Sequence, residues 1–333
     1  PVRAHAQRLA EGSGGAVQLC ETGGRVAVIV MGDSAEDLEE RGVDVVCQGE
    51  YELTVRDVLR GGGDGVAGIY PNPRRELLDV NDLPLPEDSD VRRIDYATPG
   101  EPNCEYREIQ MYAARGCPLL CNFCIASNLY YARSNHRARR VESVVEELRL
   151  MKAKYPEMEG AFFDEEIHNA DRRHVLALTR AIRAAGLDSL RYNAMCGHWT
   201  LDRETLEAMK AAGYYKIRVG VETADPATAE AMGLGPKHNL ARLEENLHVA
   251  REIGLKVYAT FTVGGRGSSL AGDLSTGELI RRLVGEGLVT DLQISINTPL
   301  PGGPFFKWAR EQGYLIEQDW SRFDGGNFAI VSY

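Results

Sequence analysis

Three cysteines lie close together in the chain, at Cys117, Cys121 and Cys124, in the spacing C-x3-C-x2-C. Three thiolates on one short loop suit three irons of a four-iron, four-sulfur (4Fe–4S) cluster, and the fourth iron is then left without a protein ligand. An open coordination position is what a reactive metal centre needs and what a structural one avoids. A zinc loop completed by a distant Cys or His is the alternative interpretation.

The composition narrows the class of protein that carries this loop. Seven cysteines among 333 residues do not indicate a disulfide framework, because the number is odd and small for the length. A net charge of −11 disfavours binding to nucleic acid or to an anionic membrane. The longest apolar run covers only residues 26–31, and the opening residues do not show the pattern of a leader peptide, so we expect neither a membrane span nor export. We therefore predict a globular, cytoplasmic protein.

A regular alternation of strands and helices surrounds the cysteines. Strands are predicted at 108–114, 160–164, 189–195, 215–221, 256–263 and 291–297. Helices are predicted at 141–154, 171–185, 202–212, 239–253 and 274–286, with another beginning near 304. The expected N-caps are Asp171, Asp202 and Asp273, and the expected stop signals are Gly186, Gly213 and Gly254. This order predicts an α/β fold, a parallel (β/α)6 partial TIM barrel, whose chemistry lies at the carboxyl ends of its strands.

The chain before the barrel also alternates, but it contains too few elements for a whole domain. Helices are predicted at 4–11, 34–41 and 53–60, and strands at 26–30 and 43–47, as in a doubly wound, Rossmann-like sheet. Glycine and proline interrupt the pattern over 61–106. We predict the end of an α/β domain at 1–80, a Pro-rich linker at 81–106 and the barrel at 107–333. We also expect the chain to be part of a longer enzyme.

The cysteine segment after the first barrel strand, with Phe123 before the last cysteine, resembles the signature of the radical S-adenosylmethionine (SAM) superfamily. The resemblance implies a 4Fe–4S cluster on Cys117, Cys121 and Cys124, with SAM chelated at the open iron. It further implies that one electron, from a flavodoxin- or ferredoxin-type protein, cleaves SAM to a 5′-deoxyadenosyl radical. That radical abstracts a hydrogen atom from the substrate.

Polar residues near the other strand ends are candidates for contacts with SAM. Carboxylates after the second strand are placed to accept hydrogen bonds from the SAM ammonium, and residues 220–223 resemble the G-x-E-S segment of the superfamily. The cofactor-binding candidates are Phe123, Asp164, Glu165, Asn193, Arg218, Glu222 and Thr262.

Three further residues are candidates for contacts with the substrate. Glu166 is a partner for a substrate amine, Cys196 is a hydrogen donor facing the barrel interior, and His198 is a proton donor. The alternative interpretations are a glutamate turned to solvent, a cysteine buried as filler and a structural histidine.

The residues before the barrel narrow the subgroup. Residues 43–52, VDVVCQGEYE, resemble the V-D-x-V-x-x-G-E-G-E stretch that closes the cobalamin-binding domain of one large radical SAM subgroup. Two departures are the missing cobalamin-ligand pattern D-x-H-x-x-G and Tyr51 in place of glycine. We therefore treat cobalamin as a cofactor without a visible ligand motif.

Three functions follow, in order of preference. The first is hydrogen abstraction leading to dehydration, deoxygenation or oxidation of a sugar or amino sugar in bacterial natural-product biosynthesis. The alternative is a cobalamin-dependent C-methyltransferase. An alternative of another class is a non-catalytic regulator that binds a corrinoid or a metal. The expected substrate is a small molecule, cationic or polyhydroxylated, because the chain is acidic, and neither nucleic acid nor membrane is an expected partner.

Overall fold

The computed structural model describes residues 16–22, 25–31, 45–61, 65–86, 88, 92–97, 99–100 and 104–332. The predicted helices at 4–11 and 34–41 lie outside these residues. Within them, no helix has both the length and the apolar character that a membrane span requires.

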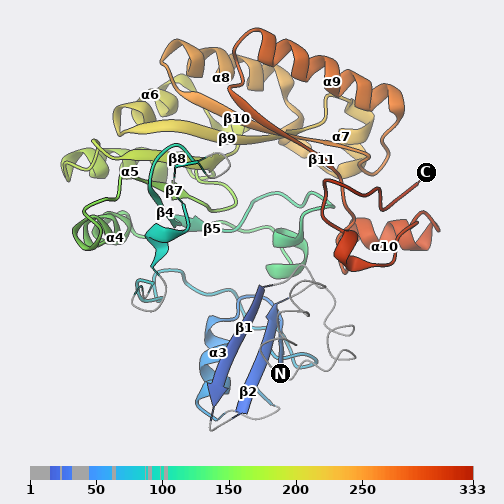
Figure 1. Ribbon diagram of the computed structural model, residues 1–333, viewed down its shortest axis with the longest axis horizontal. Helices are drawn as coiled ribbons and strands as arrows, with labels where there is room; N and C mark the ends of the chain where they lie inside the picture. The colour runs from blue at the N-terminus through green and yellow to red at the C-terminus, as the bar shows by residue number, and fades with distance from the viewer. Residues whose placement is uncertain are drawn as a thin grey trace.

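A six-stranded parallel sheet forms the centre of the structure (Figure 1). Its strands, in chain order, are β4 (Glu108–Met111), β7 (Gly160–Phe163), β8 (Arg191–Cys196), β9 (Tyr214–Glu222), β10 (Lys256–Val263) and β11 (Asp291–Ile296). Each strand pairs with the next one in the chain, which leaves β4 and β11 as the two edges. The predicted (β/α)6 partial barrel is confirmed.

Helices follow the strands of this sheet, and all but the last of them cover one of its faces, whereas the last lies apart from that layer (Figure 1). They are α4 (Val141–Lys154), α5 (Arg172–Ala184), α6 (Arg203–Ala211), α7 (Pro226–Met232), α8 (Leu240–Glu252), α9 (Leu270–Gly285) and α10 (Pro304–Glu311). The short helix α7 was not predicted. Short 3-10 turns are η1 (Arg93–Asp95), η3 (His198–Thr200), η4 (Gly235–His238) and η5 (Trp320–Arg322).

The helix boundaries test the predicted caps. The side chains of Asp171 and Asp202 accept backbone hydrogen bonds at the starts of α5 and α6, as predicted. The predicted cap at Asp273 is wrong, because α9 begins earlier and Ser269 caps it. The Asp273 carboxylate instead accepts a hydrogen bond from the backbone N–H of Gly264 at 3.1 Å. The predicted stop signals are confirmed, since Gly186, Gly213 and Gly254 all have positive φ.

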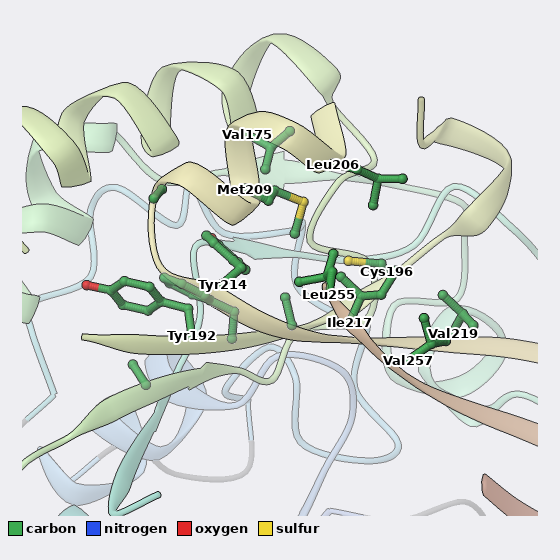
Figure 2. Close-up of a cluster of buried hydrophobic side chains, with 14 of the residues drawn as sticks. Val175, Tyr192, Cys196, Leu206, Met209, Tyr214, Ile217, Val219, Leu255 and Val257 are labelled. Atoms are coloured by element: carbon green, nitrogen blue, oxygen red, sulfur yellow. The ribbon is translucent and has the colours of Figure 1, made fainter. Parts of the chain in front are cut away.

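The hydrophobic core lies between the sheet and the helices (Figure 2). Alternate residues of β4, β7, β8 and β10 enter it, as the two-residue period of a strand requires. On β8, Tyr192, Ala194 and Cys196 belong to the core, whereas Asn193 between them contacts other interior polar residues. The opposite face of the sheet is therefore free to carry polar side chains.

A smaller sheet precedes the barrel. It consists of β1 (Ala16–Thr22), β2 (Arg25–Met31) and β3 (Val45–Cys47), followed by α3 (Glu52–Leu59). Strands β2 and β3 are parallel, as predicted, but β1 was not predicted and pairs antiparallel with β2. The signal for this hairpin is Gly23-Gly24 between two strand-like runs.

Candidate functional site

A long loop carries the three cysteines. Strand β5 (Ala114–Arg115) pairs antiparallel with β6 (Arg137–Ala138), and these two short strands close the base of residues 116–136, called here the cysteine loop. The loop begins five residues after β4 ends and contains a π-helix, η2 (Ala126–Tyr130). The cysteines therefore stand at the carboxyl edge of the barrel sheet.

The three thiols form one electrostatic group. Cys117, Cys121 and Cys124 are free of disulfides. Burial raises the pKa of Cys117, and burial raises that of Cys121 to about 11, with the neighbouring Cys124 thiolate raising both further. In the described part of the chain, no three His, Cys, Asp or Glu side chains are placed to share one metal ion. Three thiols on one loop fit a cluster in which each thiolate binds a different iron.

Glu166 contacts both arms of the cysteine loop. Its carboxylate accepts hydrogen bonds from the backbone N–H of Gly116 at 2.8 Å and from the Tyr131 hydroxyl at 2.8 Å. The predicted partner for a substrate amine thus lies against the loop and holds it to the end of β7.

Glu222, at the end of β9, is paired with a residue that the sequence analysis missed. The Lys237 ammonium, in η4, donates a hydrogen bond to the Glu222 carboxylate. Glu222 has φ of 68°, a strained conformation for a residue other than glycine. Gly220 makes room for the pair, because a Cβ there would lie 2.6 Å from both Glu222 Oε1 and Lys237 Nζ.

Lys237 also stands beside the cysteines. Its Nζ lies 5.9 Å from the centre of the Phe123 ring. Burial lowers the pKa of this ammonium, but Glu222 and the Cys121 and Cys124 thiolates raise it, and the net shift is upward. Lys237 thus places a positive charge beside the cysteines and the Glu222 carboxylate. No sequence signal points to Lys237, because it follows Glu222 by 15 residues and lies in a turn.

A cavity of about 240 Å³ adjoins the cysteine loop at the ends of β10 and β11. It brings together two predicted residues, Phe123 and Thr262, with Asn297 and Phe323. The Asn297 side chain is 4% exposed, and its Oδ1 has no hydrogen-bond partner. This cavity offers aromatic rings and an unused amide oxygen, which suits a flat heteroaromatic ligand with a donor at its edge.

Three further polar residues, Arg218, Asn193 and Glu108, form a hydrogen-bonded chain within the strands of the barrel. Arg218 Nε donates to Asn193 Oδ1 at 2.9 Å, and Asn193 Nδ2 donates to Glu108 at 2.7 Å. Four residues of β9, roughly 13 Å of strand at 3.3 Å per residue, separate Arg218 from Glu222. Asp164 directly follows β7 at the carboxyl edge of the sheet, and its side chain is exposed. Partial desolvation of its carboxyl raises the pKa, while Arg218 opposes the rise. The structure does not bring Arg218 and Asn193 to the cysteine loop.

The Glu108 carboxyl makes the folding stability of the protein depend on pH. Burial raises the pKa of its carboxyl from 4.5 to about 7. The folded chain therefore keeps a proton that the unfolded chain loses, so stability falls as the pH rises from about 4.5 to about 7. The loss is about 3 kcal/mol at most. We expect E108Q to flatten this slope in urea unfolding at pH 5 and pH 8, and E146Q, at an exposed glutamate of α4, to keep it. An unchanged slope in E108Q would contradict the assignment.

Glu165 and His198 make contacts inside the protein. One Glu165 oxygen lies 2.5 Å from His168 Nδ1, and the other accepts from the backbone N–H of Ala113 at 3.3 Å. His198 is 1% exposed, and its Nε2 lies 2.8 Å from the Lys237 carbonyl. Burial lowers the pKa of His198 to about 4, so the ring is neutral at pH 7. These contacts favour a structural role for His198 over proton donation.

Cys196 does not face the barrel interior, which corrects the prediction that it donates hydrogen there. It is 3% exposed and belongs to the core, among Leu206, Ile217 and Leu255 (Figure 2). The alternation along β8 places it on the helix-covered face, because it shares that face with Tyr192.

Comparisons with known proteins bear on this site. Residues 111–280 match the family model described as the radical SAM superfamily. An uncharacterized methyltransferase of Pyrococcus horikoshii is 25% identical over 84% of this chain and 61% of its own length. Two solved structures share the fold. The radical SAM methyltransferase TsrM from Kitasatospora setae, with cobalamin and a 4Fe–4S cluster bound, has a TM-score of 0.64 at 18% identity, over 85% of this chain and 57% of its own.

The second structure is the cobalamin-dependent SAM radical enzyme OxsB, with aqua-cobalamin and SAM bound. Its TM-score is 0.65 at 15% identity, over 92% of this chain and 51% of its own. The chain thus spans between 51% and 61% of the length of these three proteins.

Proposed function

The chain belongs to the radical SAM superfamily, and we propose that it forms part of a cobalamin-dependent C-methyltransferase. The observation that carries the proposal is the extent of the similarity. The relative named as a methyltransferase aligns with 84% of this chain, more than the barrel alone provides. The similarity to the two cobalamin-containing structures covers 85% and 92%. These comparisons favour methyl transfer over dehydration, deoxygenation or oxidation of a sugar or amino sugar.

In this proposal, Cys117, Cys121 and Cys124 hold the 4Fe–4S cluster. When bound, the cluster supplies the electron for SAM cleavage and an open iron for the amino-acid end of SAM. The residues around it have separate tasks. Glu166 fixes the cysteine loop to the end of β7 through Gly116 and Tyr131.

SAM binds between the cysteine loop and the ends of β9, β10 and β11. The Lys237 ammonium, beside the thiols, is a partner for the SAM carboxylate, and Glu222 accepts hydrogen bonds from SAM hydroxyls or its ammonium. The cavity lined by Phe123, Thr262 and Asn297 takes the adenine, because the free Asn297 Oδ1 matches the exocyclic amine of that base.

The front segment (residues 45–61 and 65–86) supports a role for the preceding domain at the same site. Arg74 Nη1 donates to the Leu129 carbonyl of the cysteine loop at 2.6 Å, and Gly49 lies so close to Tyr130 that a Cβ would stand 3.3 Å from its carbonyl oxygen. A methyl carrier bound by that domain would therefore be next to the SAM site.

The test is anaerobic reconstitution of the full-length protein with iron, sulfide, SAM and dithionite, with and without cobalamin, and mass analysis of the nucleosides. We expect S-adenosylhomocysteine only when cobalamin is present. Formation of 5′-deoxyadenosine to the same extent with and without cobalamin would overturn methyl transfer in favour of dehydration or oxidation. Binding of cobalamin or metal with no SAM turnover would favour a regulator. A candidate substrate is then sought among small metabolites by mass increase of one methyl group.

A further inference from the structure

A buried carboxylate of the front segment reaches the base of the cysteine loop. Glu50 stands between β3 and α3 and is 4% exposed. Its Oε2 accepts hydrogen bonds from Arg137 Nη1 at 2.8 Å and from the backbone N–H of Leu78 at 2.8 Å. Its Oε1 lies 3.4 Å from Arg115 Nη1. One carboxylate of the front segment thus contacts two arginines at the base of the cysteine loop.

Those two arginines are direct cross-strand partners. Arg115 of β5 is paired with Arg137 of β6, and each side chain is only 18% exposed. Like charges directly opposite one another destabilise an antiparallel pair, and burial strengthens the repulsion by reducing screening. The pair at the base of the cysteine loop therefore needs a counter-ion, and Glu50 occupies the position between the two guanidinium groups.

A second carboxylate, Glu52, neutralises only one of the two arginines. Glu52 Oε1 lies 2.5 Å from Arg115 Nη1. No contact of Glu52 with Arg137 is recorded in the described part of the chain, so it does not bridge the pair. Of these two carboxylates, Glu50 is the one that contacts both arginines.

The base of the loop is connected to the first cysteine. Arg115 is separated from Cys117 by one residue, and Arg137 Nε donates to Asn135 Oδ1 at 3.2 Å. The backbone N–H of Asn135 in turn donates to the Cys117 carbonyl at 3.0 Å. A shift of Arg137 therefore reaches the backbone of Cys117 through two hydrogen bonds. A shift of Arg115 reaches it through the single residue between them.

We infer that Glu50 is a positioning residue that holds the base of the cysteine loop closed, so that the loop takes its cluster-binding form only when the front segment is docked. The inference concerns assembly of the site and not the reaction performed there. Removing the Glu50 charge leaves two buried guanidinium groups opposed, and the loop opens at β5 and β6 while the sheet from β7 to β11 stays intact.

The test uses hydrogen–deuterium exchange of the metal-free full-length protein. In E50Q we expect amides of residues 112–138 to exchange at least tenfold faster, with unchanged exchange in β9 and β10. Reconstituted E50Q should hold less iron and lose it faster to a chelator. The matched control is E105Q, which removes a carboxylate that contacts two lysines, Lys216 and Lys256, away from the cysteine loop. It should lower overall stability without selective opening of residues 112–138.

Rescue separates charge repulsion from loss of packing. In E50Q/R137Q one of the opposed charges is gone, so exchange over residues 112–138 should slow again towards the wild-type rate. If E50Q does not fold, the double variant should restore folding. The inference is overturned if E50Q exchanges and retains iron like the wild type, or if removing Arg137 gives no recovery. Because exchange is measured without metal, failure of the methyl-transfer proposal would leave this result unchanged.

Discussion

We expect C117A, C121A and C124A each to lose SAM cleavage by on the order of 10³-fold or more in anaerobically reconstituted protein. We expect a large loss because each thiolate is proposed as the protein ligand of one iron, and loss of a residue that only supports a metal ligand already costs roughly 10- to 100-fold in affinity. The three variants should also lose the brown colour and the signal of a reduced 4Fe–4S cluster in electron paramagnetic resonance.

The matched control is C104A. The Cys104 thiol donates to the Tyr106 carbonyl at 2.9 Å, before β4 and at the opposite end of the strands from the cysteine loop. We expect C104A to keep its iron and its SAM cleavage. Cleavage by any of the three loop variants at the wild-type rate would remove that cysteine from the ligand set. Iron retained in all three would overturn the assignment of the cluster.

K237M has the second-largest expected effect, on the reduction potential of the cluster. Reduction adds a negative charge, and a cation beside the thiolates stabilises the reduced form, so removing the ammonium lowers the potential. A tenfold change in the equilibrium corresponds to about 59 mV for one electron, and we expect a shift on the order of that size. The variant also leaves the buried Glu222 carboxylate without its partner, so SAM affinity should fall.

The measurement is a redox titration followed by electron paramagnetic resonance, with and without SAM. The matched control is K256M, because Lys256 also pairs with a glutamate, Glu105, but at the amino end of β10. K256M should keep the wild-type potential, and K237R should keep most of it because the charge remains. A wild-type potential in K237M with weakened SAM binding would confine Lys237 to contacts with SAM. If K237M kept both the wild-type reduction potential and the wild-type SAM affinity, the proposed role of Lys237 would be contradicted.

The barrel was predictable because its elements carry strong local signals. The strand at 256–263 and the helix at 141–154 match the structure residue for residue. Each has a clear apolar pattern, and the strand sits between a stop signal and a Gly-Gly turn. The start of α9 was misplaced because Asp273 is as good a cap by residue type as Ser269, and only the backbone path of the chain decides between them.

The site could be predicted from the sequence only where its residues lie close together in the chain. The three cysteines lie within one loop, so their spacing alone indicated the chemistry. Lys237 was missed because it reaches Glu222 through a turn whose conformation the sequence does not dictate. The prediction for Cys196 failed because the face on which its side chain lies depends on the register of β8, and a shift of one residue exchanges the two faces of the sheet.

The strand order of the barrel has a consequence for how the protein folds during synthesis. Every strand pairs with its predecessor in the chain, so the sheet can grow one βα unit at a time as residues leave the ribosome. Cys121, however, is buried by Met232 and Leu234, and Asn122 Nδ2 bonds to the Ala231 carbonyl, 109 residues further along. The nascent cysteine loop thus stays accessible to iron donors and to oxygen until α7 has been made.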